Sequence, residues 1–316
     1  TGRRTRNWTN RAGSLTLPPP NLRAIAMPRT DQLHRFVFDN SDVRGEIISL
    51  SESYLAVLEN GRYPAPVALL LGEMLAAVGL LSATLKFDGT ISLQARGEGD
   101  LSLAMADCTR HRLLRGIARL KDDANPETGN ILELLGKGHL AITIDPARGE
   151  RYQGIVPLED SSLSACLESY FRLSEQIPTR LWLHADGERA AGLLLQALPA
   201  RHQTPEERDD YWQHLATLAD TLGGEELLAE DNETLLRRLF HGERTRVFEP
   251  ETPQFACSCS RERTAQMLRS LGEREVRSII EERGLVEVDC QFCHQQYRFD
   301  RTEVDRLFSP SGSTLH

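Results

Sequence analysis

Four of the six cysteines in this chain lie in its last quarter, in two close pairs. One residue separates Cys257 from Cys259, two residues separate Cys290 from Cys293, and 30 residues lie between the pairs. Thiolates are preferred ligands of zinc in structural sites, where four of them surround the ion tetrahedrally. Two close pairs, each on a turn, supply such a set. We therefore predict that these four cysteines bind one Zn²⁺ ion in the reduced state.

The spacing of the cysteines also allows redox chemistry. Structural zinc sites usually place roughly two to four residues within a pair, so the single residue between Cys257 and Cys259 is unusual. A disulfide across one residue is expected to be strained, and strained disulfides are readily reduced. The two-residue spacing of Cys290 and Cys293 is typical of redox-active dithiols. An inert structural zinc site and a thiol switch therefore both remain open at this point.

The cysteines belong to a predicted small module, residues 257–308. Its expected elements are helices at 262–271, 273–283 and 300–308 and strands at 285–288 and 297–299. A module of this size with few large apolar side chains is marginally stable without a metal or disulfides. Bound zinc contributes ~10–16 kcal/mol to such modules. Because a disulfide sulfur is a poor zinc ligand, oxidation of either pair would release the ion and unfold the module.

Residues 201–256 form a predicted acidic, helical and metastable linker, with 13 acidic and 6 basic side chains. Short helices are expected at 205–222, 225–228 and 233–240, separated by glycines. Their apolar side chains form only a thin stripe, which needs another surface to pack against. Our hypothesis is that loss of the module loosens this linker and that its exposed apolar side chains then bind unfolded chains. The candidate client-binding residues are Trp212, Leu215, Leu218, Leu235, Leu236 and Phe240.

Residues 27–200 have the pattern of an α+β domain with mainly antiparallel strands. Strands are expected around Phe36 and Phe38 and at 90–96, 101–105, 140–144, 152–158, 180–184 and 190–198. The apolar segment 66–85 is long enough to span a membrane, but Glu73 and two glycines interrupt it. We therefore predict a buried core helix there.

The remaining composition limits the class of protein. The net charge of −9 and the pI near 5.6 argue against a nucleic-acid or anionic-membrane partner. The low cysteine density argues against a secreted disulfide scaffold and favours a cytoplasmic protein. Cys108 and Cys166 are expected to be buried small hydrophobic residues. Residues 1–26, rich in arginine, are expected to be an extension outside the fold, and residues 309–316 a tail.

Taken together, these residues resemble the thirty-three-kilodalton heat-shock protein family of redox-regulated chaperones. The cysteine spacing is that family's signature. The resemblance runs over nearly all of residues 27–308. Its segments are DQLHRFVFDN at 31–40, TLKFDG at 84–89, GERYQGIV at 149–156, YFRLSEQIPTRL at 170–181, LLLQALPA at 193–200 and CSCSRER at 257–263.

The resemblance implies a chaperone that is not an enzyme and that holds unfolding proteins without ATP. Such a chaperone is inactive while reduced and zinc-bound. Oxidation by hypochlorite, or by peroxide with heat, would form the disulfides Cys257–Cys259 and Cys290–Cys293, release zinc and unfold the module and the linker. The oxidised form would be a homodimer, and its clients would pass to ATP-dependent foldases.

Three other functions remain to be weighed. A zinc-ribbon nucleic-acid binder is disfavoured because residues 257–308 carry nine basic and ten acidic side chains. A dithiol oxidoreductase using Cys290 and Cys293 lacks the expected βαβ context. A purely structural zinc protein would lose its function on oxidation instead of gaining one.

Overall fold

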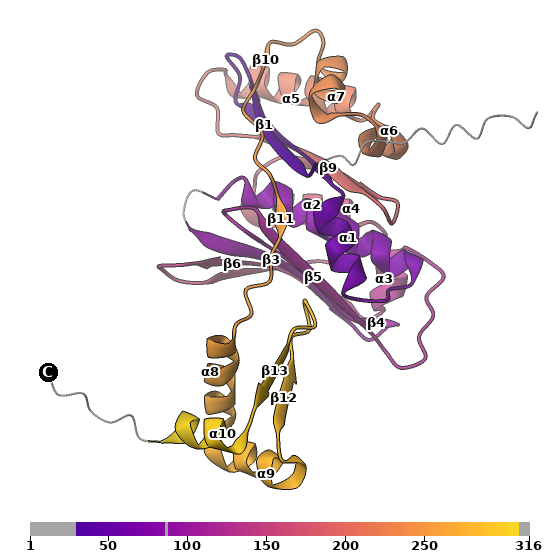
Figure 1. The fold of residues 1–316 in the computed structure, drawn as a ribbon. Coiled ribbons are helices and arrows are strands. Elements are labelled where there is room, and N and C mark those ends of the chain that lie inside the picture. The colour runs from indigo at the N-terminus through magenta and orange to yellow at the C-terminus, as the bar shows by residue number, and fades with distance from the viewer. Residues whose placement is uncertain (1–29, 86–87, 310–316) are drawn as a thin grey trace, which may run out of the picture.

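The computed structural model describes residues 30–85 and 88–309 of the 316-residue chain (Figure 1). It has mixed α and β structure with mainly antiparallel strands, so the predicted α+β class is confirmed. The predicted extension at residues 1–26 and residues 310–316 of the predicted tail lie outside the described residues.

Two sheets form the body of the molecule. Sheet A has the strand order β10-β1-β2-β9-β8, and sheet B has the order β11-β5-β4-β3-β6-β7. The strands of sheet A are β1 (Gln32–Phe38), β2 (Val43–Leu50), β8 (Thr179–Ala185), β9 (Ala190–Ala197) and β10 (Thr245–Val247). Those of sheet B are β3 (Gly89–Gly97), β4 (Leu101–Thr109), β5 (Leu113–Leu120), β6 (Gly138–Pro146), β7 (Tyr152–Val156) and β11 (Gln254–Phe255).

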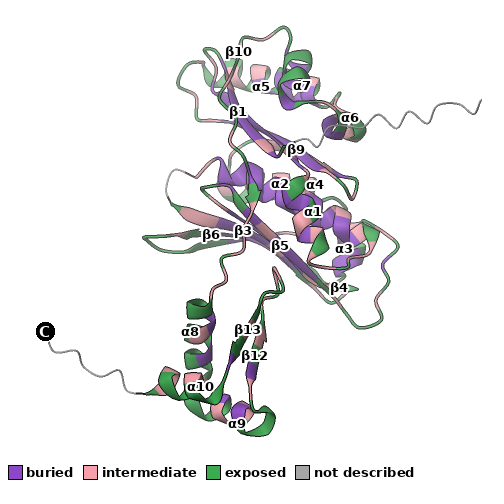
Figure 2. Cartoon of the chain, viewed as in Figure 1, coloured by how far each residue is buried: buried purple, intermediate pink, exposed green. Residues whose placement is uncertain are grey.

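The helix α2 (Ala65–Ser82) lies between the two sheets and forms the centre of the main core. It contacts β2, β8 and β9 on one side and β3, β4 and β5 on the other. A helix that is apolar on all sides is stable only when it is covered on all sides. Although α2 is long and apolar enough to cross a membrane, 78% of it is buried in the protein (Figure 2). The predicted core helix at residues 66–85 is therefore confirmed.

Smaller helices close the ends of this core. These are α1 (Glu52–Glu59), α3 (Ile131–Leu135), α4 (Leu163–Tyr170) and the π-helical turn η1 (Phe171–Glu175). Helix α4 continues directly into η1, because the hydrogen bonding changes from the α-helical to the wider π-helical pattern at Phe171.

We call the part of the chain that forms the two sheets and α2, residues 30–85 and 88–200, the first domain. The acidic segment that follows it packs three helices on the outer face of sheet A. They are α5 (Pro205–Ala219), α6 (Gly224–Ala229) and α7 (Asn232–Leu239), which contact β2, β8 and β9. Side chains alternate between the two faces of a strand. Phe36 and Phe38 of β1 therefore point to these helices, while Leu33 of the same strand points to α2. Sheet A is thus apolar on both faces.

Residues 201–256, predicted to be a helical linker, contain short helices close to those expected and two short strands that were not predicted, β10 and β11. Strand β10 pairs antiparallel with β1, and β11 pairs parallel with β5. Each therefore adds an edge strand to one sheet. We call residues 245–256, which run from the edge of sheet A to the edge of sheet B, the strap (Figure 1).

The C-terminal module has its own small core. It comprises α8 (Arg261–Leu271), α9 (Glu273–Arg283), β12 (Val286–Asp289), β13 (Gln296–Phe299) and α10 (Arg301–Phe308). Figure 1 shows it beyond sheet B, on the side away from α2. The buried apolar side chains of this core are Leu268, Val276, Ile280, Val286, Phe299 and Val304. So few buried side chains leave the module dependent on a further source of stability.

The buried carboxyl group of Glu46 in sheet A leads to a prediction about how the stability of the protein depends on pH. Burial raises the pKa of Glu46 from 4.5 to about 7, although Arg44 opposes this shift. The folded protein therefore holds the proton more tightly than the unfolded chain, and the stability from this group falls as the pH rises through 7. Glu46→Gln should raise the free energy of unfolding by about 1–3 kcal/mol at pH 8 and leave it unchanged near pH 4.5. Chemical denaturation at both pH values, with the exposed Glu188→Gln as the control, measures this difference.

Candidate metal centre and its contacts with the first domain

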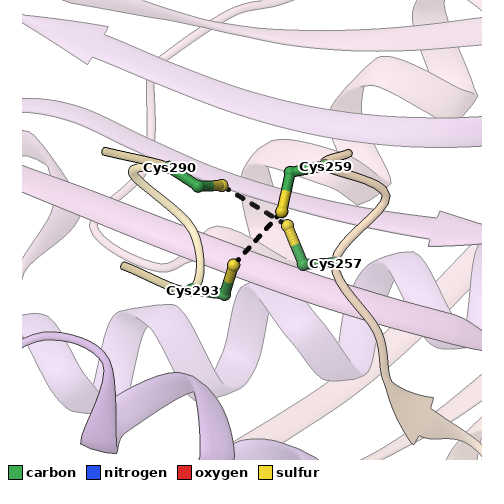
Figure 3. A group of neighbouring side chains, drawn as sticks. All are labelled: Cys257, Cys259, Cys290 and Cys293. Carbon is green, nitrogen blue, oxygen red and sulfur yellow. Dashed lines mark hydrogen bonds between the residues drawn. The ribbon is translucent and has the colours of Figure 1, made fainter. Parts of the chain in front are cut away.

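The structure brings the four predicted cysteines together at the junction of the strap and the module. Cys257 and Cys259 lie between β11 and α8, and Cys290 and Cys293 lie on the turn between β12 and β13. Their side chains converge in Figure 3. The Sγ atoms of Cys257 and Cys290 are 3.5 Å apart, and those of Cys259 and Cys293 are 3.4 Å apart. All four sulfur atoms lie within 4.8 Å of one another.

This arrangement fits a tetrahedral metal ion. Four sulfurs each about 2.3 Å from one ion lie about 3.8 Å from each other, close to the distances observed here. Backbone hydrogen bonds hold the second pair in place. The amide of His294 donates to the carbonyl of Cys290 (2.8 Å), and the amide of Cys290 donates to the carbonyl of Gln295 (3.0 Å). The turn that carries Cys290 and Cys293 is therefore fixed by backbone hydrogen bonds in a geometry suited to a metal.

The electrostatics of the cluster also favour a cation. Burial alone would raise the pKa of Cys259, but hydrogen bonds from the Tyr297 hydroxyl and from the other thiols lower it to about 7. The Tyr297 oxygen lies 3.2 Å from the Cys259 sulfur. Burial and then the neighbouring thiols raise the pKa of Cys293. Because four thiolates so close together repel one another, they coexist only around a positive ion.

One arginine of sheet B contacts a residue inside each cysteine pair, Ser258 in the first pair and Phe292 in the second. Arg115 lies on β5 and forms an ion pair with Asp107 of β4 at 2.7 Å. Its Nη1 atom donates to the hydroxyl of Ser258, the residue between Cys257 and Cys259, at 2.9 Å. Its guanidinium also lies 4.2 Å from the ring centre of Phe292, which stands between Cys290 and Cys293. The cluster is therefore connected directly to sheet B.

The contact between Arg115 and Phe292 leads to a prediction. Phe292→Ala removes a cation–π contact that contributes about 1 kcal/mol, so the module should separate from sheet B more often. We expect a chelator to remove metal from the reduced variant about five times faster than from the unchanged protein. A colorimetric chelator assay measures this rate.

Two further variants make the test specific. Met267→Ala removes an exposed apolar side chain elsewhere on the module and should leave the rate unchanged. Arg115→Lys keeps a positive charge beside Asp107 but loses the planar guanidinium. The double variant should lose metal more slowly than the two single effects multiplied together predict, because both substitutions remove the same cation–π contact and Arg115→Lys additionally disturbs only the hydrogen bond to Ser258. Fully multiplicative effects on the rate would show that Arg115 and Phe292 do not act through one contact.

The six candidate client-binding residues lie at one interface. Trp212, Leu215, Leu235, Leu236 and Phe240 are buried and Leu218 is partly buried, all in the cluster between the linker helices and sheet A. The Phe240 ring lies 5.1 Å from that of Phe38 and 5.9 Å from that of Phe36. In this structure the candidates are therefore covered, and they reach solvent only if the helices leave the sheet.

The two remaining cysteines lie apart from the cluster, as predicted. Cys108 is buried and its thiol donates to the hydroxyl of Ser82 at 3.2 Å. Burial raises its pKa to about 12. Cys166 is also buried, and burial raises its pKa. Thiols so rarely ionised react slowly with oxidants.

Sequence reasoning missed the residues that hold the strap in place. Glu251 and Leu33 exchange two backbone hydrogen bonds, of 2.8 and 2.9 Å. The Glu251 carboxylate also binds the buried guanidinium of Arg112 through two contacts, of 3.0 and 3.1 Å. Pro250 and Pro253 indicate an extended segment in the sequence, because prolines at this spacing exclude a helix between them.

Comparisons with known proteins identify the family of this chain. The profile of the Hsp33 protein family matches residues 31–300. A 33 kDa chaperonin of Pseudomonas paraeruginosa is 54% identical over 289 residues, covering 91% of this chain and 97% of that protein. One of Azotobacter vinelandii is 55% identical over 285 residues, covering 90% and 96%.

A solved structure supports the fold. The crystal structure of the 33 kDa chaperonin, or heat shock protein 33 homologue, of Thermotoga maritima superposes with a TM-score of 0.76 at 21% identity. It covers 87% of this chain and 97% of that one. From the match over residues 31–300 and the identity to the chaperonins, this chain belongs to the Hsp33 family of chaperones.

Proposed function

We propose that this protein is a redox-regulated holdase, a chaperone that binds unfolding proteins without ATP and prevents their aggregation. The observation that carries the proposal is the position of the four-cysteine cluster. It joins the end of the strap to the module and touches sheet B through Arg115. A change at the cysteines therefore acts directly on the segment that covers the first domain.

In the reduced state, Cys257, Cys259, Cys290 and Cys293 would hold one Zn²⁺ ion as thiolates. The ion would neutralise the four charges and stabilise the module by ~10–16 kcal/mol. This closed set of four sulfurs leaves no position for a substrate, so we propose a regulatory site and no enzymatic activity.

Activation would follow from oxidation of the cysteines. In each pair, two thiolates lose two electrons to a peroxide or hypochlorite, and one sulfur–sulfur bond forms, with peroxide reduced to water. We propose the pairs Cys257–Cys259 and Cys290–Cys293, as the family resemblance implies. The disulfide sulfurs no longer bind the metal, and the module loses the stabilisation on which its small core depends.

We further propose that residues 257–308 are the switch module and residues 201–256 the metastable linker, which covers the folded domain of residues 27–200. When the linker leaves sheet A, both its own apolar stripe and the face containing Phe36 and Phe38 become available to unfolded clients. The oxidised protein would act as a cytoplasmic homodimer and pass clients to ATP-dependent foldases, without nucleic-acid or membrane partners.

The test follows zinc and chaperone activity together. The reduced protein is treated with peroxide at raised temperature, zinc release is recorded with a colorimetric chelator, and light scattering follows aggregation of a heat-denatured client. We expect aggregation to be suppressed only after zinc release and thiol loss. Zinc release with no gain in suppression would instead indicate a purely structural metal site. Turnover of a small disulfide substrate would indicate an oxidoreductase.

A further inference from the structure

The strap covers the edge of β5 in the way that a bound peptide covers the edge of a sheet. The amide of Gln254 donates to the carbonyl of Arg112, and the amide of Ala256 donates to the carbonyl of Leu114, both at 2.9 Å. Extended peptides commonly bind proteins by adding a strand in this way. The edge of β5 can therefore hold an extended segment through backbone hydrogen bonds, which do not depend on sequence.

Two side chains of the strap fill specific positions beside this edge. Phe255 packs against the main core. Glu251, four residues earlier, neutralises Arg112, whose side chain is only 7% exposed. The Arg112 guanidinium also donates to the hydroxyl of Ser82 at 3.0 Å. If the strap left, it would expose an apolar position and leave a buried cation without its carboxylate, which is costly.

The pairing of the strap with β5 is short, and its end is next to the cysteines. Only Gln254 and Phe255 form β11, and Cys257 follows two residues later. A change in the oxidation or metal binding of Cys257 would therefore act on the adjacent end of this strand. An edge strand left uncovered presents free N–H and C=O groups and readily pairs with another chain.

We infer that the edge of β5 is a client-binding site, which takes an extended segment of an unfolded polypeptide in place of β11. The inference rests on the proposed function, because the strap must leave β5 when the cysteines are oxidised. Backbone pairing lets the site accept many sequences. Segments with an acidic residue four positions before an aromatic one, as in Glu251 and Phe255, should bind most tightly.

The probe for the test is the strap sequence itself, the fluorescent peptide EPETPQFA (residues 249–256). Fluorescence anisotropy measures its affinity for the full-length protein, reduced with zinc and oxidised without it. We expect the oxidised protein to bind the peptide at least about tenfold more tightly, because the reduced protein's own strap occupies the edge. Phe255→Ala in the oxidised protein should increase peptide affinity further, since it weakens that internal competitor.

Matched peptides separate strand pairing from apolar contact. N-methylation of the amides at Gln254 and Ala256 removes both hydrogen bonds to β5 and should weaken binding about tenfold or more. The amide of Phe255 points away from β5 in the alternating pattern of a strand, so its N-methylation should change affinity less than about threefold. Glu251→Gln in the peptide should weaken binding about tenfold through the loss of charge beside Arg112.

Each outcome decides the inference. Equal binding of all N-methylated peptides would overturn it, because apolar contact alone would then explain the affinity. Failure of the unmodified peptide to bind an oxidised protein that still suppresses aggregation would also overturn it and leave the proposed function intact. If oxidation produced neither peptide binding nor suppression of aggregation, the proposed function would fail as well.

Discussion

Cys293→Ser is expected to abolish metal binding by the reduced protein and to unfold residues 257–308. A hydroxyl is a far weaker ligand than a thiolate, and the remaining three sulfurs leave the tetrahedron open. Loss of a contribution of ~10–16 kcal/mol exceeds what six buried apolar side chains can replace. Metal content per chain should fall to near zero, and far-ultraviolet circular dichroism should lose the signal of α8, α9 and α10.

Limited proteolysis tests whether the unfolding is confined to the module or extends into the first domain. Trypsin should cut the variant at Arg269 and Arg274 while the first domain stays intact, since among the described residues its core and the core of the module have no side chain in common. Cys166→Ser is the matched control, because it removes a buried thiol that lies outside the cluster. It should retain full metal content and resist the protease. Full metal content in Cys293→Ser would show that this cysteine is not a ligand.

The metal cluster could be predicted from the sequence because its signal is local. Close cysteine pairs bring two ligands together whatever the rest of the chain does, and a metal then joins the pairs. The long helices α2, α8 and α9 could be predicted equally well, since the sequence of each has a continuous helical pattern. Their ends differ from the predicted ones by only a few residues.

The edge strands and the contacts around the cluster could not be predicted. Strands β10 and β11 have three and two residues and exist only because β1 and β5 provide partners far away in the sequence. Strand β5 was missed because Arg115 and Gly116 interrupt its apolar pattern. The role of Arg115 depends on Ser258, which lies 143 residues away. No local pattern contains that information.

The sequence of β9 contained evidence that the linker helices pack on sheet A, and the prediction did not use it. Strand β9 has the sequence AAGLLLQA and is buried at every position. A continuous apolar strand is typical of a sheet covered on both faces. Helix α2 covers one face of β9, so the thin stripe of the linker was the remaining candidate to cover the other.

Phe240→Ala is expected to release the linker from sheet A without any change at the cysteines. The ring of Phe240 is 1% exposed and packs edge-on against Phe38. Removing such a ring from a core contact lowers stability by about 3–5 kcal/mol. This loss is large compared with the stability that a single interface gives three short helices. The reduced variant, with its metal bound, should therefore suppress client aggregation and bind a hydrophobic dye, and we expect the unchanged reduced protein to do both only weakly.

The linker supplies its own control for this variant. Phe248 lies in the strap with 41% of its surface exposed, so Phe248→Ala removes the same ring at little cost and should leave the reduced protein inactive. Metal content must be equal in the two variants, because the cluster is untouched in both. If Phe240→Ala still needed oxidant to suppress aggregation, docking of the linker on sheet A would not be what keeps the chaperone inactive. Activity in the reduced, metal-bound variant would instead place the control of client binding at this interface, with the cysteines acting on it from a distance.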